Sequence, residues 1–199
     1  MKAILKTIAF GFATIVVTPA LASYAIRSAF FGRDRALQGS SQALSLVPGV
    51  LGQYLRRAFY CHVLDECHPS VTIEFGVLLS KAAVRLEPNV YVGPRCDLGH
   101  VHLERDVLLA SGVIVPSGPD THGTALLDLP IREQPGRMRT VRIGAGSWIG
   151  SGAIVMADVG RDSVVAAGAV VTESVPDRVI AAGIPARVVR ERVTGQVSA

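Results

Sequence analysis

Aliphatic residues recur at every sixth position over much of this sequence, a period that fits neither an α-helix nor an alternating β-strand. The clearest stretch runs from Val141 to Arg190, where two runs are separated by a two-residue deletion. The aliphatic positions are Ile143, Ile149 and Val155, then Val159, Val165 and Val171. Small or β-branched residues follow four places later, at Ser147, Ala153, Ser163, Ala169 and Val175. Each six-residue unit therefore contains two inward positions, one short strand and one corner.

Three such units would close a triangular coil of about 18 residues, and coils stacked about 4.8 Å apart would satisfy each other's backbone groups. The spacing extends back along the chain with one seven-residue and one five-residue step. These earlier positions are Ile73, Leu79, Leu86, Val92, Leu98, Leu103, Leu109 and Val115, and the places four later hold Val77, Val90, Cys96, Val107 and Val113. We therefore expect an all-β domain, a parallel β-helix over residues 71–190, with Cys96 pointing inward.

One segment interrupts the coil. Residues 117–140 are rich in proline, glycine and charge, and they lack the six-residue period. They are expected to form a loop excursion from one corner, and long loops on rigid scaffolds are commonly functional. After Val175, Pro176 ends the regular units, so residues 179–189 are expected to form a last irregular turn. Residues 191–199 have the composition of a polar C-terminal tail.

The N-terminal segment, residues 1–35, is hydrophobic. It contains an uncharged run from Thr7 to Ile26 that is about long enough to span a bilayer, with basic residues on both sides. One interpretation is a retained membrane anchor. Another is a secretory signal that is cleaved after Ala22, since Pro19 and small residues precede that position. A third is a buried helix that packs on the coil.

Residues 36–70 are expected to form an amphipathic helical cap. From Val50 onward, apolar residues follow one helical stripe, whereas Arg56 and Arg57 are expected to point away from it. The stripe consists of Val50, Leu51, Tyr54, Leu55, Ala58 and Phe59. A basic helix of this kind either lies in the membrane interface or covers the open end of the first coil, and both could hold at once.

Charge and cysteine content narrow the functional classes. The formal net charge is +4, but the arginines are scattered and not interleaved with aromatic residues, which argues against nucleic-acid binding. Cys61, Cys67 and Cys96 are odd in number and irregularly spaced, which favours a reducing compartment over a disulfide framework. The Cys61-His62 and Cys67-His68 pairs lack the spacing of a structural zinc site.

Three segments carry a family resemblance: Trp148-Ile149-Gly150-Ser151, the units from Val164 to Thr172, and the stretch Ala182-Gly183-Ile184-Pro185-Ala186-Arg187 that continues to Arg190. They resemble the hexapeptide-repeat acyltransferases, including the galactoside, maltose and exopolysaccharide O-acetyltransferases. The resemblance implies a left-handed coil and a homotrimer whose active sites lie between two subunits. It also implies acetyl transfer from acetyl-CoA to a hydroxyl of a sugar or lipid-linked sugar, in surface or exported polysaccharide synthesis. Since acetyl-CoA is cytosolic, the resemblance favours a retained N-terminal anchor at the cytoplasmic face of the cell membrane.

Acyl transfer to a hydroxyl needs a base for the hydroxyl proton, and His122 is the one histidine in the excursion. The resemblance implies that His122 is the general base and that Asp97 touches the acceptor, while Asp120 could orient His122. It also places six residues along the bound acetyl-CoA: Trp148, Ser151, Ala167, Thr172, Arg187 and Arg190. Glu173 departs from the pattern, because many relatives have lysine there. No metal is expected.

Two alternatives remain open from the sequence. The γ-type carbonic anhydrases share the coil and bind zinc through three histidines, so His100, His102 and His122 suggest that class. Those enzymes use a histidine pair four residues apart, which this chain lacks. The other alternative is a non-catalytic β-helix scaffold. The excursion and the Pro185-Ala186-Arg187 ending favour an enzyme, because a scaffold needs neither.

Overall fold

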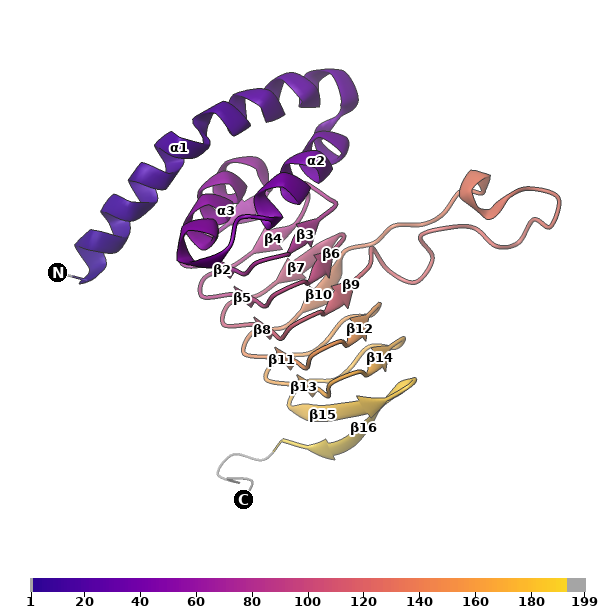
Figure 1. Ribbon diagram of the computed structural model, residues 1–199. Helices are drawn as coiled ribbons and strands as arrows, with labels where there is room; N and C mark the ends of the chain where they lie inside the picture. The colour runs from indigo at the N-terminus through magenta and orange to yellow at the C-terminus, as the bar shows by residue number, and fades with distance from the viewer. Residues whose placement is uncertain (1, 193–199) are drawn as a thin grey trace.

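The structure is a computed structural model that describes residues 2–192, with side chains described from Thr7 onward. Within that range, helices α1 (Lys2–Phe31), α2 (Arg33–Ser45) and α3 (Gly49–Val63) lie at one end of a three-sided coil of short strands (Figure 1). Strands of successive coils pair in parallel on each side. The predicted parallel β-helix is confirmed.

Each side of the coil is one sheet. Sheet A contains β1 (Glu66–Cys67), β4 (Arg85–Leu86), β7 (Val101–Leu103) and β10 (Val141–Ile143). Sheet B contains β2 (Thr72–Ile73), β5 (Tyr91–Val92), β8 (Leu108–Leu109), β11 (Trp148–Ile149), β13 (Val164–Val165), β15 (Val179–Gly183) and β16 (Ala186–Glu191). Sheet C contains β3 (Leu78–Leu79), β6 (Asp97–Leu98), β9 (Ile114–Val115), β12 (Ile154–Val155) and β14 (Val170–Val171). The coil begins at Glu66, before the predicted Val71, because β1 already pairs with β4.

The core of the coil is built from the inward positions that the six-residue period predicts. The second residue of each two-residue strand after β1 is buried, and matching residues stack from coil to coil, as Ile149 does between Leu109 and Val165. Cys96 is fully buried, as predicted, and its thiol donates to the Ala110 carbonyl at 3.1 Å. Branched aliphatic side chains fill this narrow interior at high density.

The helices cover the first coil. Helix α3 packs against β1 and β2, and α2 packs against β3. Exposed strand edges invite unwanted pairing, so a covering helix at this end protects the coil from edge-to-edge association. The opposite end is covered by β16, which pairs antiparallel with β15. Strands β15 and β16 form a hairpin whose turn contains a cis Ile184-Pro185 bond. Because the two strands are paired, the predicted irregular turn is wrong.

Arg56 and Arg57 do not point away from the cap, contrary to the prediction. Arg56 is fully buried, and its guanidinium donates to the carbonyls of Leu44, Val47 and Ile73 at 3.1, 2.7 and 3.0 Å. These carbonyls end α2, line the following turn and belong to β2, so one cation joins three segments. The prediction from the helical stripe is wrong for Arg56 because the buried carbonyls need a hydrogen-bond donor, and the long arginine side chain reaches them.

The part of the predicted stripe that begins α3 is also different. Val50 and Leu51 are 65% and 63% exposed, whereas Ala58 and Phe59 are fully buried. Arg57 lies over the rings of Phe10 and Tyr54, with 5.3 and 4.5 Å from its guanidinium carbon to the ring centroids. The buried face of α3 is therefore set by its three neighbours: the coil, α1 and α2.

The predicted excursion leaves the coil after β9 and returns at β10, and it projects away from the coil (Figure 1). Its two legs are held together by backbone hydrogen bonds from Arg139 to Ser117 at 2.9 Å and from Arg137 to Asp120 at 2.6 Å. A short 3₁₀ turn, η1 (Ile131–Glu133), lies near the tip. Residues 191 and 192 of the predicted tail still contact the coil, since Glu191 belongs to β16 and the Arg192 N–H donates to the Arg178 carbonyl. Residues 193–199 lie outside the described range.

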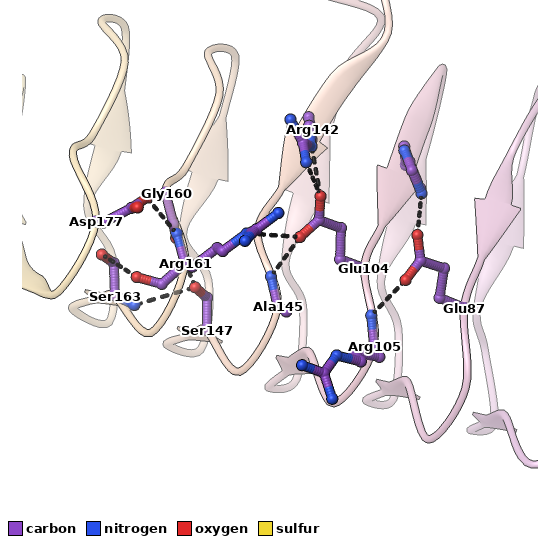
Figure 2. A network of polar contacts seen from close by, with 11 residues as sticks. Glu87, Glu104, Arg105, Arg142, Ala145, Ser147, Gly160, Arg161, Ser163 and Asp177 are labelled. Carbon is purple, nitrogen blue, oxygen red and sulfur yellow. Dashed lines mark hydrogen bonds and ion pairs between the residues drawn. The ribbon is translucent and has the colours of Figure 1, made fainter.

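Figure 2 shows the polar contacts of the corner between sheets A and B. Ser147 and Ser163 point inward as predicted, and each hydroxyl donates to a corner carbonyl of the next coil at 2.7 Å. Each also accepts a backbone N–H, from Ser163 at 3.0 Å and from Val179 at 3.2 Å. An alanine would fill the same space but leave these buried backbone groups unpaired.

Glu104 is the buried carboxylate of this corner. Its side chain is 7% exposed and accepts the Ala145 N–H at 2.9 Å and the Arg142 guanidinium (Figure 2). Burial alone would raise the pKa of Glu104, but these donors outweigh it and hold the pKa below the ordinary value of 4.5. The carboxylate therefore stabilises the fold fully above pH 4.5, and that contribution is lost as the pH falls through the lower folded-state pKa.

We expect Glu104→Gln to lower the free energy of unfolding by about 1–3 kcal/mol at neutral pH, because charge-assisted hydrogen bonds are lost. The difference from the unsubstituted chain should shrink in acid. Thermal unfolding followed from pH 7 to pH 3 would measure both effects. Glu66→Gln is the matched control, since Glu66 forms a partly exposed ion pair with Arg85 at 2.8 Å and should cost under about 1 kcal/mol. Equal losses for the two variants would contradict the role of Glu104.

Candidate active site

A row of small, exposed residues follows the corner between sheets B and C. Ser111, Ser151 and Ala167 each precede a glycine with positive φ, and the rungs are joined by Gly152 N–H to Ser111 and Gly168 N–H to Ser151 hydrogen bonds of 2.9 Å. The positive φ explains the glycines, because other residues adopt it at a cost. Short side chains along this corner allow an extended ligand to approach the backbone of several coils. Ser151 and Ala167 were predicted to line acetyl-CoA.

Trp148 adds an apolar surface beside this row. It lies on β11 in sheet B, with its side chain half exposed between Leu108 and Val164 on the neighbouring strands. An exposed tryptophan offers a large flat contact area, which suits the arm of a long ligand. The structure therefore brings Trp148, Ser151 and Ala167 together on sheet B and its corner with sheet C.

The predicted arginines lie on the terminal strand. Arg187 and Arg190 are exposed on β16, and Thr172 is exposed just after β14. The Arg187 guanidinium forms an ion pair with the Glu173 carboxylate at 3.4 Å. The glutamate that departs from the family pattern therefore neutralises a predicted phosphate ligand.

We expect Glu173→Gln to tighten acetyl-CoA binding about 1.4- to fivefold, because an exposed ion pair is worth roughly 0.2–1 kcal/mol and its loss frees Arg187 for phosphate. Titration calorimetry would measure the dissociation constant. Glu191→Gln is the control, because it changes the net charge equally at an exposed residue on β16. It should have a smaller effect on the dissociation constant. Equal tightening by both variants would show a long-range charge effect and contradict the pairing argument.

His122 lies on the first leg of the excursion, exposed to solvent. Within residues 2–192, its imidazole has no hydrogen-bond partner, and Asp120 contributes only its backbone carbonyl to the opposite leg. In the described part of the single chain, the Asp120 carboxylate therefore makes no hydrogen bond to His122 that would orient the imidazole. The imidazole is free to meet a substrate or a neighbouring subunit.

Gln134 is a positioning residue that sequence reasoning missed. Its side chain is buried, accepts the Leu126 N–H at 3.0 Å, and donates to the carbonyls of Leu126 and Leu129 at 2.6 and 2.9 Å. These bonds close the tip of the excursion beyond His122. Ser111 was also missed, although the Ser-Gly pair that it begins matches Ser151-Gly152 and could have been found by aligning the units.

Asp97 projects from β6 on the outer face of sheet C, next to Ile114 on β9. The excursion starts shortly after β9, and the His100 N–H donates to the Ser117 hydroxyl at 3.0 Å at its root. Burial raises the pKa of the Asp97 carboxyl above its ordinary value. Asp97 and the root of the excursion are therefore neighbours on sheet C.

The predicted residues form two groups in one chain. Ser151 and Ala167 lie where sheet B meets sheet C, whereas the excursion with His122 leaves where sheet C meets sheet A. The two groups are separated by the width of sheet C. A single chain therefore does not bring His122 to Ser151 and Ala167, whereas Thr172 follows β14 at the same edge of sheet C as the excursion.

A hollow of about 460 Å³ lies elsewhere, at the corner of sheets A and B. It is lined by Glu87, Glu104, Arg105, Asp106, Ala145, Gly146, Arg161, Asp162 and Arg178, and none of these is a predicted site residue. The Glu87 carboxylate already contacts the His102 imidazole and accepts the Arg105 N–H, and Glu104 is paired with Arg142 and the Ala145 N–H. This hollow is better explained as part of the corner network.

The histidines do not converge. His102 contacts Glu87 at 2.7 Å on sheet A, and His122 lies in the excursion. Across the described part of the chain, no three His, Cys, Asp or Glu side chains come together in a way that could hold a metal ion. Within one chain, the described residues therefore do not form the three-histidine zinc site of the carbonic anhydrase alternative.

The chain folds as a three-sided β-helix of six-residue repeats, and known proteins show a similar repeat and a similar fold. Residues 140–173 match the family described as hexapeptide repeat of succinyl-transferase. The chain is 45% identical over 53 residues to galactoside O-acetyltransferase of Escherichia coli (strain K12), which is 26% of each protein. It thus spans about a quarter of the length of the curated relatives it matches.

Solved structures show the same fold over more of the chain. A maltose O-acetyltransferase from Clostridium difficile 630 superposes with a TM-score of 0.69 at 18% identity, covering 80% of this chain and 88% of that one. A galactoside acetyltransferase in complex with coenzyme A superposes with a TM-score of 0.64 at 20% identity, covering 80% and 82%. The resemblance predicted from the repeats is confirmed in sequence and in fold.

Proposed function

We propose that this protein is an O-acetyltransferase that moves the acetyl group of acetyl-CoA to a hydroxyl of a sugar or lipid-linked sugar. The observation that carries the proposal is the combination of an exposed histidine on a projecting excursion with a separate row of small residues beside Trp148. Among the described residues, the His122 imidazole has no hydrogen-bond partner, and the row of small residues suits a long thioester arm. The sequence match to a galactoside O-acetyltransferase supports the same chemistry.

His122 acts as general base in this proposal. A neutral imidazole takes the proton of the acceptor hydroxyl as the oxygen attacks the thioester carbonyl, and the coenzyme A thiolate leaves. The transfer is direct. Burial raises the pKa of the Cys96 thiol to about 11, and Cys96 is sealed in the coil, so it is a poor nucleophile.

A homotrimer completes the site. The excursion carries five exposed large apolar side chains: Leu126, Leu127, Leu129, Ile131 and Met138, with Leu127 99% exposed. Apolar side chains on a projecting segment are stabilised by burial against another surface. A neighbouring copy would provide that surface and would bring His122 to the row of Ser151 and Ala167, which one chain keeps apart. Sedimentation of the active enzyme in detergent tests this, and an active monomer would refute it.

We place the enzyme at the cytoplasmic face of the cell membrane, in the synthesis of surface or exported polysaccharide. The apolar run of α1 supports membrane contact, since residues 7–31 are long and apolar enough to cross a bilayer by length and composition alone. A cytosolic position supplies acetyl-CoA. N-terminal sequencing of the protein from cells should begin at or near Met1, and a start at Ser23 would instead establish a cleaved signal.

The reaction is tested by measuring coenzyme A release from acetyl-CoA with panels of free sugars, nucleotide sugars and lipid-linked sugars. Acceptor-dependent release with a new ester in the product supports the proposal. Matched amino sugars distinguish hydroxyl from amine acceptors. Release that never depends on any sugar would overturn the proposed acceptor class.

A further inference from the structure

Helix α1 has two apolar faces, and only one of them contacts the protein. Large side chains on the outer face are strongly exposed, from 63% for Ile8 and Ile26 to 78% for Phe30. The outer stripe consists of Ile8, Phe12, Ile15, Pro19, Ala22, Ile26 and Phe30, which follow one another at steps of three and four residues. No charged residue lies between Thr7 and Ile26. The stripe is thus a continuous apolar strip along most of α1.

The inner face packs lengthwise on the helical cap. Ala13, Val17 and Tyr24 are buried, and the Tyr24 ring meets Phe59 of α3 edge-on at 5.9 Å. Near one end, the Phe10 ring lies under the Arg57 guanidinium at 5.3 Å. These contacts tie α1 to α3 along its length.

The other end is tied to α2. The Arg27 guanidinium donates to the Ala36 carbonyl at 2.9 Å and to the Ser40 hydroxyl at 2.6 Å. From Phe10 to Arg27 the helix rises about 25 Å at 1.5 Å per residue. The attachment thus extends over most of the length that a membrane span would need.

We propose that α1 lies in the plane of the membrane, with its outer stripe inserted into one leaflet and its inner face on the cap, and does not span the bilayer. This inference rests on the proposed membrane localisation and specifies its geometry. A spanning α1 that kept its contacts would draw α3, with its buried Arg56, into the hydrocarbon. A spanning α1 that gave them up would uncover Phe59 and would remove the Arg27 guanidinium from the Ala36 carbonyl and the Ser40 hydroxyl.

The matching partner is the boundary between acyl chains and headgroups in a bilayer that contains anionic lipid. An in-plane helix buries its apolar face about 5–10 Å deep. Basic residues lie at both ends of the apolar strip: Lys2 and Lys6 precede it, and Arg33 and Arg35 follow it. In-plane binding would also hold the capped end of the coil against the membrane (Figure 1), and the opposite end would extend into the cytosol.

The test uses the full chain bound to vesicles of phosphatidylcholine and phosphatidylglycerol. In a variant with Cys61, Cys67 and Cys96 replaced by serine or alanine, single cysteines are placed at Ile8, Ile15, Ile26 and Phe30 and labelled with a fluorophore. Quenching by lipids brominated at different depths should place all four labels at similar, shallow depths. In the unlabelled Ile8→Cys and Phe30→Cys variants, a membrane-impermeant thiol reagent added outside the vesicles should react with the single cysteine to the same extent.

A depth profile that is deepest at Ile15, with one end protected from the reagent, would overturn the in-plane arrangement and keep the membrane localisation. No binding to vesicles would overturn both, and acetyl transfer measured in detergent would be unaffected. Contact between labels of two chains without lipid quenching would show that α1 packs on a second copy, which also overturns the proposal.

A charge substitution provides an independent measurement. Ile15→Glu should weaken vesicle binding at least about tenfold, because an apolar side chain in the interface is replaced by a charge. Val189→Glu is the matched control, since Val189 is 61% exposed on β16 at the other end of the coil and Ile15 is 71% exposed. Equal binding by the two variants would contradict insertion of the outer stripe.

Discussion

Replacing His122 with alanine is expected to lower kcat for acetyl transfer by roughly 10²- to 10⁴-fold, the usual range for losing a general base. The affinity for acetyl-CoA should change little. In each chain, Ser151 lies at the far edge of sheet C from the root of the excursion and Trp148 lies beyond it on sheet B, so they do not depend on the imidazole. Steady-state kinetics and calorimetry on the purified variant separate the two quantities.

Two controls make this result specific. His68→Ala removes another exposed histidine, one whose Nδ1 lies 2.8 Å from the Ser70 hydroxyl at the start of the coil, and should leave kcat unchanged. Cys96→Ala should leave turnover largely intact, because the thiol is buried in the core. If His122→Ala kept near-normal turnover and Cys96→Ala abolished it in a folded trimer, a covalent route through the thiol would replace the proposed direct transfer.

Replacing Arg56 with methionine is expected to destabilise the helical cap by about 3–5 kcal/mol, because several charge-assisted hydrogen bonds to buried carbonyls are lost together. Methionine fills much of the same space, but the carbonyls of Leu44, Val47 and Ile73 lose the guanidinium donor, and of the three the Leu44 carbonyl still accepts the Val47 N–H at 3.3 Å. A buried polar group without a partner costs about 1–3 kcal/mol. Far-UV circular dichroism during heating would follow the loss of the helices.

Arg57→Met is the matched control, because it removes the neighbouring arginine of the same helix. Arg57 stacks on Phe10 and Tyr54, and such cation–π contacts are worth about 0.5–2 kcal/mol. The Arg57 variant should therefore unfold much closer to the unsubstituted chain than the Arg56 variant. Equal destabilisation would mean that the three carbonyls do not depend on Arg56. Gly52 contributes to the same site, since a Cβ there would lie 2.0 Å from the Val47 carbonyl oxygen.

The coil could be predicted from the sequence because its determinant is local. Each unit repeats the same choice of an inward aliphatic residue, a second inward small residue and a corner, so Ile149 and Cys96 were placed correctly by counting alone. The excursion was found by the same rule, as the segment where the count fails. The resemblance to sugar O-acetyltransferases could be read for a related reason, since Trp148 to Ser151 and the Pro185 ending are contiguous in the chain.

Tertiary structure decided whatever depends on contacts between distant segments. Arg56 looked like a solvent-facing residue, and it is buried because carbonyls from α2, its following turn and β2 meet around it. Ser147 looked like a small core residue, and its hydroxyl satisfies the backbone of the next coil. Arg187 looked like a free phosphate ligand, and folding brings Glu173 to it. In each case a polar group buried or paired by folding must find a partner, and the partner is far away in sequence.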